Sequence, residues 1–496
     1  MPLRPRLRAP TVVCALLVGS VGLSAPAAQG VPVPGFPLPA ACRSDGPELR
    51  YVVLFVPATP ALLATSEVAG ACGASSAYYP EIGVGVASSS DPAFADRIGR
   101  DRTYSAAAEA LAGAATPDPA GRSSFPLERA EPRTSESTDV APADRAAEQW
   151  DMAMIGATRS RAVAPGDPGV VVGVLDSGVD PDHPDLAAAI DPERSAGCLT
   201  GAPDPAPDSW VPTSSTHGTH VAGTIAAADD GKGIAGVAPG VRIASVKVVD
   251  DAGFIYPEYA VCGFMWAARQ GMQVTNNSYF VDPWLFTCAD QPGQAVAHEA
   301  VRRAVEFATG AGVLAVAAAG NERLDLSDPA EDVGSPSNRP DPRPRPVDDG
   351  CDVLPAELPG VIAVSAVGAQ RVMSGYSSFG LGVVDVTAPG GDPEQASGVS
   401  SSGCVLSTVP GGYGYACGTS MASPHATGVA ALLASTHPDA DPDELTELLT
   451  THADPIACSP LPAVVPAGEA AAPCQGAAAN GFYGHGLVDA LDAVTR

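Results

Sequence analysis

Basic residues are scarce in this sequence. Its 496 residues include 27 Lys and Arg against 56 Asp and Glu, which gives a formal net charge of -29 at pH 7. Such a charge repels both a phosphate backbone and an anionic membrane surface. We therefore exclude nucleic acid as an expected partner and interpret the acidic excess as a solvated surface.

Long apolar segments are also missing. The apolar run over residues 11–23 is too short for an ordinary membrane span, and no later segment offers about 20 uninterrupted apolar residues. Arginines precede this run and small residues follow it, which predicts a secretory signal peptide over residues 1–29. We expect a secreted, extracellular protein with no membrane attachment after export.

No Cys-x-x-Cys pair is present, and Cys and His are nowhere grouped at the spacing of a zinc site. An exported chain meets an oxidising compartment, where thiols pair with one another. Cys14 lies in the predicted signal peptide, so the other ten of the 11 cysteines are available for up to five disulfides. Their connectivity stays open from the sequence, and we expect consecutive pairing.

Two folded parts are expected, because the chain is longer than a typical domain and 45% of its residues are hydrophobic. A Pro-rich spacer over residues 30–48 leads into a small α+β domain over residues 49–113. Residues 114–148 hold few large apolar side chains, so we predict a disordered linker that is open to cleavage. The predicted order in the small domain is strand, helix, strand, helix, strand, at 49–56, 61–68, 81–87, 92–98 and 103–106.

Residues 149–496 alternate between short apolar strands and helices. This alternation predicts an α/β fold with a mostly parallel sheet and helices on both faces. The proline-rich, charged stretch 324–349 interrupts the pattern, and we interpret it as a surface insertion. Strands are predicted at 170–175, 242–249, 313–318, 361–367 and 383–386, and helices at 256–269, 298–308 and 420–435.

Polar residues follow the predicted strands, at the edge where α/β sheets collect catalytic groups. Asp176 comes directly after a strand, where a carboxylate can orient an imidazole, although Asp-Ser-Gly is otherwise a turn or a helix cap. His217 and His220 stand in His-Gly-Thr-His, whose glycine allows close backbone approach. Either could act as a base. A metal pair is disfavoured, because the Glu of the helical zinc-protease pattern is missing.

A serine and an asparagine complete the set. Ser420 stands in Gly-Thr-Ser-Met-Ala-Ser-Pro-His, at the predicted start of a helix whose amides stabilise negative charge. As an isolated motif it would be an N-cap. Asn321 ends a buried strand in Ala-Ala-Ala-Gly-Asn; it is ordinarily a turn residue, but beside a nucleophile its amide would donate to an oxyanion.

Together these segments resemble the subtilisin-like serine protease family, whose triad also runs in the order Asp, His, Ser. The likeness covers residues 149–496. It includes Gly-Val-Ala-Pro at 236–239, Ala-Pro-Gly at 388–390 and Gly-His-Gly-Leu-Val-Asp at 484–489. Residues 49–107 also resemble the family's inhibitory propeptide, which is a small chaperone domain.

The resemblance implies a role for each singled-out residue. Asp176 would orient His217, which would act first as the base and then as the acid. Ser420 would attack the substrate carbonyl, and Asn321 would hold the oxyanion together with the Ser420 amide. His220 would be structural.

The substrate cleft departs from the family pattern on one wall. The family usually has Asn-x-Ser-Leu-Gly-Gly where this chain reads Asn-Asn-Ser-Tyr-Phe-Val-Asp over residues 276–282, which changes the shape of the pocket. The opposite wall is retained, and a substrate strand could pair along it. The expected substrate-binding residues are Ser278, Tyr279, Ala318, Ala319 and Gly320.

Structural calcium is common in the family, and two acids suggest where it could bind. Asp185 resembles a ligand position, and Asp230 lies in a nearby loop. Carboxylates are suitable hard-oxygen ligands, and solvated loop acids are the alternative. No cofactor is expected to be required for the chemistry.

The resemblance favours a secreted, monomeric serine endopeptidase that hydrolyses protein or peptide substrates through an acyl-enzyme. Its own propeptide would act as chaperone and intramolecular inhibitor until self-cleavage between residues 108 and 149. One alternative is a peptide-processing subtilase of narrow specificity, such as those that cut lantibiotic leaders. Another is a non-catalytic binding protein on the same scaffold, which the intact set of catalytic residues argues against.

Overall fold

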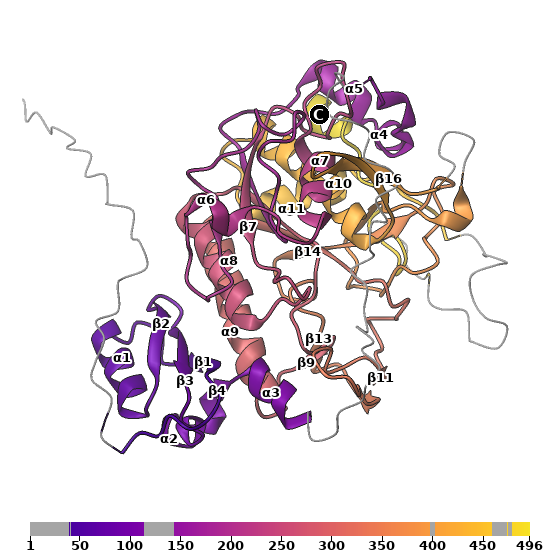
Figure 1. The fold of residues 1–496 in the computed structure, drawn as a ribbon. Coiled ribbons are helices and arrows are strands. Elements are labelled where there is room, and N and C mark those ends of the chain that lie inside the picture. The colour runs from indigo at the N-terminus through magenta and orange to yellow at the C-terminus, as the bar shows by residue number, and fades with distance from the viewer. Residues whose placement is uncertain (1–38, 40, 114–142, 397–401, 459–473, 475–478) are drawn as a thin grey trace, which may run out of the picture.

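The computed structural model of the chain describes residues 39, 41–113, 143–396, 402–458, 474 and 479–496 (Figure 1). The predicted signal peptide over residues 1–29 lies outside the described residues. So do residues 30–38 and 40 of the predicted spacer and residues 114–142 of the predicted linker.

The larger part of the chain is built around a seven-stranded sheet in the order β15-β14-β10-β8-β5-β7-β6. All neighbouring strands of this sheet are parallel, which confirms the predicted α/β fold. The strands are β5 (Val171–Asp176), β6 (Ala196–Gly197), β7 (Arg242–Lys247), β8 (Val274–Asn277), β10 (Leu314–Ala318), β14 (Val361–Val367) and β15 (Val386–Pro389).

The strand predictions for this sheet need three corrections. β8 was not predicted, because Val-Thr-Asn-Asn lacks the apolar run that marks a buried strand, and the two-residue β6 was also missed. The strand expected over residues 383–386 begins only at Val386. The amides of Val383 and Val384 instead donate to the Gly380 carbonyl in a turn.

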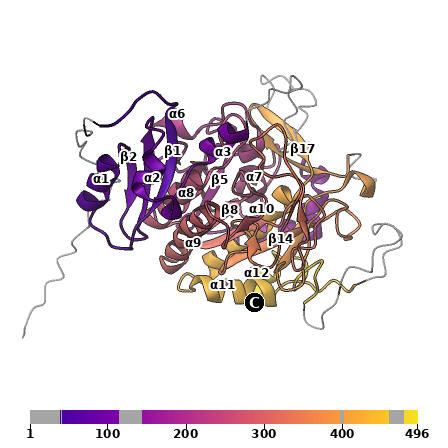
Figure 2. The same ribbon diagram turned by 90° about the horizontal axis from the view of Figure 1, so that it is seen from below.

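Helices cover both faces of the sheet, as predicted (Figure 2). α7 (His217–Ala226) and α10 (Thr419–Thr436) contribute to the core on one face, together with Val172 and Val174 of β5. α8 (Pro257–Arg269) and α9 (Gln294–Gly310) contribute to the core on the other face, together with Val171 and Leu175. Alternate residues of a strand point to opposite faces, so one continuous apolar strand serves both cores.

The N-terminal part is a four-stranded antiparallel sheet in the order β2-β3-β1-β4, with short helices. The predicted five-element order is wrong, because strand β2 and helix α3 were not predicted. The strand expected from residue 81 begins at Val84, because Gly83 closes a turn onto the Pro80 carbonyl at φ +63°. The elements are β1 (Leu49–Leu54), α1 (Ala61–Gly70), β2 (Ala74–Tyr79), β3 (Val84–Ser89), α2 (Phe94–Ile98), β4 (Thr103–Tyr104) and α3 (Ala106–Gly113).

The N-terminal sheet packs against α8 and α9, as Figures 1 and 2 show. Tyr79 and Tyr104 belong to the same buried apolar cluster as residues of both helices. Arg303 of α9 donates from Nη1 to the carbonyls of Phe55, at 2.9 Å, and Ile82, at 3.0 Å. The two parts are therefore joined by a buried interface as well as by the chain.

Consecutive cysteines are paired, which confirms the expected pattern. The five disulfides are Cys42–Cys72, Cys198–Cys262, Cys288–Cys351, Cys404–Cys417 and Cys458–Cys474.

The stretch 324–349 is a surface insertion only in part. It contains a short antiparallel pair, β11 (Glu331–Asp332) and β12 (Arg345–Pro346). Asp332, Ser335 and Ser337 are buried, at 0%, 2% and 8% exposure. The prediction of a surface loop is wrong for these residues. Arg345 pairs with Asp332, and the distant residues Leu285 and Pro283 form hydrogen bonds with Ser335 and Ser337.

Among the described helices, none has both the length and the apolar character needed to cross a membrane.

The remaining elements surround this framework. These elements are η1 (Arg100–Arg102), η2 (Ala146–Glu148), α4 (Trp150–Met154), α5 (Ala157–Val163), α6 (Pro207–Trp210), β9 (Thr287–Cys288), β13 (Cys351–Asp352), η3 (Pro393–Gln395), β16 (Val405–Val409), β17 (Gly412–Ala416), α11 (Pro442–Thr451) and α12 (Asp492–Thr495).

Candidate active site

Asp176 and His217 face each other at the carboxyl edge of the sheet. Asp176 is the last residue of β5, and His217 is the first residue of α7. The Nδ1 atom of His217 lies 2.9 Å from each carboxylate oxygen of Asp176. Asp176 is 1% exposed, so its carboxylate holds the ring without competition from bulk water and leaves Nε2 to exchange protons with a substrate or nucleophile.

Gly218 allows the Asp176 and His217 segments to meet. A Cβ at position 218 would lie 2.4 Å from the Gly178 carbonyl oxygen and 3.1 Å from Asp176 Oδ1. The Gly218 amide donates to Ser177 Oγ at 3.0 Å, and the Ser177 amide donates to Asp176 Oδ1 at 2.6 Å. A larger residue at position 218 would therefore displace the carboxylate or the helix start.

Burial and charge act in opposite directions on His217. Burial disfavours the imidazolium, but the charge of Asp176 and its hydrogen bond outweigh burial and raise the pKa of His217 above its ordinary value. For His220, burial and then the charge of His217 lower the pKa to about 3. His220 is 1% exposed and its Nε2 lies 3.2 Å from the Val405 carbonyl, so it is a neutral, internally bonded ring.

Ser420 is the second residue of α10, so its amide and hydroxyl lie at the positive end of the helix dipole. Its hydroxyl donates to the Ser278 carbonyl at 3.4 Å, and Ser278 Oγ donates to the Ser420 carbonyl at 2.9 Å. α10 packs against α7, which carries His217. Ser420 thus lies at the same edge of the sheet as Asp176 and His217. A serine–histidine hydrogen bond often forms only when substrate is bound.

Asn321 follows β10 and directs its side-chain amide toward the start of α10. Its Oδ1 accepts hydrogen bonds from the amide and the hydroxyl of Thr419, each at 2.9 Å. These bonds fix the amide plane and leave Nδ2 for another acceptor. A Cβ built on Gly418 would lie 3.6 Å from both Asn321 Nδ2 and the Ser420 amide nitrogen. The two donor nitrogens therefore lie at the same short distance from one point, and an oxyanion site requires two such neighbouring donors.

The polar strand β8, which the sequence analysis missed, holds the helix that carries Ser420. Asn276 is 0% exposed, and its Oδ1 accepts from Ser423 Oγ at 2.9 Å and from Thr427 Oγ1 at 3.0 Å. Its Nδ2 donates to Ser278 Oγ at 2.9 Å. Each partner of this buried amide therefore helps to hold α10 in place: Ser423 and Thr427 belong to α10, and Ser278 donates to the Ser420 carbonyl. The two adjacent asparagines were the available signal, but they were assigned only to the cleft wall.

The predicted substrate-binding residues differ in exposure. Ser278, Ala318 and Ala319 are 2%, 5% and 1% exposed, so a ligand would meet mainly their backbone. Gly320 is half-buried and has a φ of +108°, where a side chain would be strained. Their contact with substrate stays a prediction.

Tyr279 is turned into the core. It is 7% exposed, it belongs to the cluster around α8 and α9, and its hydroxyl donates to Asn277 Oδ1 at 3.1 Å. Burial, and then the charge of Asp176, raise the pKa of Tyr279. This bulky residue therefore fills core space behind the cleft wall.

The two predicted calcium ligands face hydrogen-bond donors. Asp185 Oδ2 accepts from the Ile234 amide and the Tyr413 hydroxyl, both at 3.0 Å. The exposed Asp230 lies 3.5 Å from the ammonium of Lys232. Donors and an ammonium do not suit a bound cation, so these groups do not fit calcium and we derive no role for it.

An imidazole held by a carboxylate, a serine at a helix start and two amide donors are the groups that acyl transfer through a serine requires. The subtilase family model matches residues 167–486, which include all four of these residues. The chain belongs to the subtilase family.

Curated relatives cover the same region of this subtilase. Fervidolysin from Fervidobacterium pennivorans is 32% identical over 325 residues, which are 61% of this chain and 40% of the relative. Subtilisin NAT from Bacillus subtilis subsp. natto is 36% identical over 270 residues, which are 54% of this chain and 56% of the relative. The chain thus spans about half the length of these two curated relatives.

A solved structure extends the likeness in fold. The epidermin leader peptide processing serine protease EpiP from Staphylococcus aureus has a TM-score of 0.66 and 20% sequence identity. The match covers 90% of this chain and 98% of the solved chain. At this identity the likeness shows the fold alone, and it confirms the predicted subtilisin-like architecture.

Proposed function

We propose that this subtilase is a secreted serine endopeptidase in which Asp176, His217 and Ser420 form the catalytic triad. The observation that carries the proposal is the Asp176–His217 contact at 2.9 Å, at the same sheet edge as the helix start that bears Ser420. The predicted signal peptide supports export. Protein or peptide chains are the substrates, and the proposed chemistry uses protein groups alone.

In the proposed mechanism, Ser420 Oγ attacks the carbonyl carbon of the scissile peptide and His217 Nε2 takes the hydroxyl proton. Negative charge then develops on the carbonyl oxygen, where Asn321 Nδ2 and the Ser420 amide donate hydrogen bonds. When the C–N bond breaks, the His217 imidazolium gives its proton to the leaving amine and an ester to Ser420 remains. Water, deprotonated by His217, hydrolyses this ester and restores the serine.

The N-terminal part is proposed to be the propeptide, which assists folding and inhibits the enzyme until the linker is cut between residues 108 and 149. Its support is the buried interface with α8 and α9, because a domain that shares an apolar core with the enzyme does not leave at once after a cut. The enzyme would make this cut itself.

A second candidate is a peptide-processing protease of narrow specificity. The family usually has small residues on one side of the cleft. This chain instead has the buried Tyr279 there, and a hydrogen bond holds the insertion 324–349 to the segment that follows Tyr279. EpiP, whose fold is similar, processes the epidermin leader peptide.

The test compares the secreted precursor with its Ser420→Ala variant by mass and by hydrolysis of casein. The proposal expects the wild type to shorten and to digest casein, while the variant stays full length and inert. If both shorten and only the wild type digests casein, another protease performs maturation. If a folded wild type freed of its N-terminal part cuts a specific leader-type peptide and not casein, the narrow processing role is correct.

A further inference from the structure

Two segments of the larger part form one surface beside the N-terminal part. We call residues 282–288 and 332–351 together the clamp surface. The Ser337 amide donates to the Pro283 carbonyl at 2.8 Å, and the Leu285 amide donates to Ser335 Oγ at 2.8 Å. The two segments are therefore joined along their length, although some 50 residues separate them in the chain.

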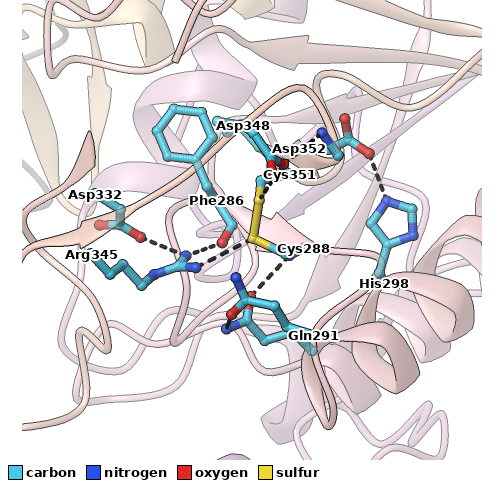
Figure 3. The surroundings of a disulfide bond; sticks show 12 residues. Phe286, Cys288, Gln291, His298, Asp332, Arg345, Asp348, Cys351 and Asp352 are labelled. Carbon is cyan, nitrogen blue, oxygen red and sulfur yellow. Dashed lines mark hydrogen bonds and ion pairs between the residues drawn. A yellow bond between two sulfur atoms is a disulfide. The ribbon is translucent and has the colours of Figure 1, made fainter. Parts of the chain in front are cut away.

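An ion pair and a disulfide fix the clamp surface from inside (Figure 3). Arg345 donates to Asp332 Oδ2 at 2.8 Å, and the Asp332 side chain is 0% exposed. Cys288 and Cys351 link the segments covalently where β9 pairs with β13. The Arg345 guanidinium lies 4.8 Å from the centroid of the Trp284 ring, so it supports the indole.

Two hydrogen bonds join the clamp surface to the N-terminal part where β4 turns into α3. The Trp284 indole donates from Nε1 to Tyr104 Oη at 3.2 Å. Asn338 donates from Nδ2 to the Ala106 carbonyl at 2.9 Å. Tyr104 and Ala106 are 6% and 3% exposed, so these polar contacts are closed off by apolar packing, which strengthens them.

This junction is well placed to control the N-terminal part. β4 and α3 are its last elements before residues 114–142, where the proposed cut would fall. On the other side, Trp284 follows within six residues of Ser278, whose carbonyl accepts from Ser420 Oγ. The clamp surface therefore continues the wall beside Ser420 and holds the end of the N-terminal part nearest to the cut.

We propose that the clamp surface is the docking site for the β4–α3 junction, and that it sets how long the N-terminal part stays bound after the linker is cut. The partner is this chain's own segment 103–113. This inference rests on the proposed function of the N-terminal part as an inhibitor. It assigns to the clamp surface the task of delaying activation, separately from the broad contact with α8 and α9.

The first test uses the Ser420→Ala precursor, which does not depend on catalysis. Asn338→Asp keeps the side-chain shape but removes the donor to Ala106, and Trp284→Phe removes the donor to Tyr104. Hydrogen exchange over residues 103–113 should become about fivefold faster for each lost hydrogen bond. Arg343→Ala is the control, because Arg343 is 82% exposed in the same insertion.

Unchanged exchange in both folded variants, or an equal increase in Arg343→Ala, would overturn the proposal. Should Asn338→Asp fail to fold, Trp284→Phe decides, since the phenyl ring can still lie on Arg345.

The second test uses the active precursor and follows the cut N-terminal fragment by size-exclusion chromatography. In Asn338→Asp the fragment should leave about fivefold sooner, and the lag before peptide hydrolysis should shorten equally. Equal retention in the variant and the wild type contradicts the inference but not the proposed protease. A wild type that neither shortens nor hydrolyses any peptide contradicts the proposed function, while the exchange test still decides the inference.

Discussion

The proposed catalytic edge, which holds Asp176, His217 and Ser420, and the clamp surface both bury charged groups, but their positions are fixed in different ways. At the proposed catalytic edge, Asp176 ends a strand and His217 and Ser420 lie at the starts of helices, so the backbone places each group. On the clamp surface, Asp332 is held by Arg345 within short strand pairs, and little regular structure surrounds them. The comparison teaches that the framework positions the chemistry, while side-chain pairs and a disulfide build the surface beside it.

The largest difference between the two regions is expected when a buried aspartate is replaced in each, because one replacement should affect kcat and the other stability. Asp176→Asn should lower kcat of the processed enzyme by about 10⁴-fold, the size of loss known for Asp–His–Ser enzymes, because the His217 tautomer and imidazolium lose their support. Asp332→Asn should leave kcat nearly unchanged and lower stability. Steady-state kinetics and denaturant unfolding measure both. A similar kcat loss in the two variants would erase the distinction.

Removing a disulfide should cost stability according to the loop it closes. In the Ser420→Ala precursor, Cys288→Ser with Cys351→Ser should lower the free energy of unfolding by about 4 kcal/mol, and Cys404→Ser with Cys417→Ser by about 3 kcal/mol. The sequence separations are 63 and 13 residues. Denaturant titrations give both values. A larger loss for the shorter loop would mean that local packing dominates over chain entropy.

Two asparagine amides allow a matched test of function. Asn321→Ala should lower kcat by about 10²–10³-fold with little change in KM, as removal of this donor does in subtilisin, because the amide acts on the transition state. Asn338→Ala should leave kcat of the processed enzyme unchanged. An Asn321 variant that changes KM alone would assign this residue to ground-state binding instead.

The last effect expected, which is the smallest over a single pH unit, is a pH dependence at the clamp surface. The pKa of Asp282 is raised to about 7, chiefly by burial. Hydrogen bonds from Ser337 and the Ile255 amide act to lower this pKa, and the charge of Asp250 acts to raise it. The folded state therefore keeps a proton that the unfolded chain releases near pH 4. Stability should thus fall as pH rises between about 4 and 7, by up to about 1.4 kcal/mol per pH unit.

Asp282→Asn, made in the Ser420→Ala precursor, removes this titration. The difference in unfolding free energy between this variant and its parent should change with pH from 5 to 7 and become constant above pH 8. A difference that is constant over the whole range would contradict the assignment to Asp282.

The sequence predicted that Asp176, His217 and Ser420 lie at one edge of the sheet, because each of these residues stands in a local sequence signal. A Val-rich run ends at Asp176, and glycines stand next to His217 and near Ser420, where close backbone contact is needed. These signals are contiguous, so no knowledge of distant partners was required. The exposure of Asn321 and the hydrogen bonds that aim its amide came only from the structure.

The remaining features depend on partners far away in the chain. Asn276 lies in a central strand because Ser423 and Thr427 satisfy its amide, which local propensity cannot indicate. Tyr279 was expected at the pocket, but a hydrophobic space behind the wall accepts it. Likewise, Ser335 and Ser337 in a proline-rich stretch give no sign that segment 283–285 covers them.

The most direct test of the account is covalent labelling with a fluorophosphonate, which reacts only with an activated serine. The processed protein is labelled, digested and mapped by mass spectrometry. The account predicts one adduct, on the peptide that contains Ser420, and none after Ser420→Ala. An adduct on another serine, or none on a processed protein that still hydrolyses casein, would contradict it.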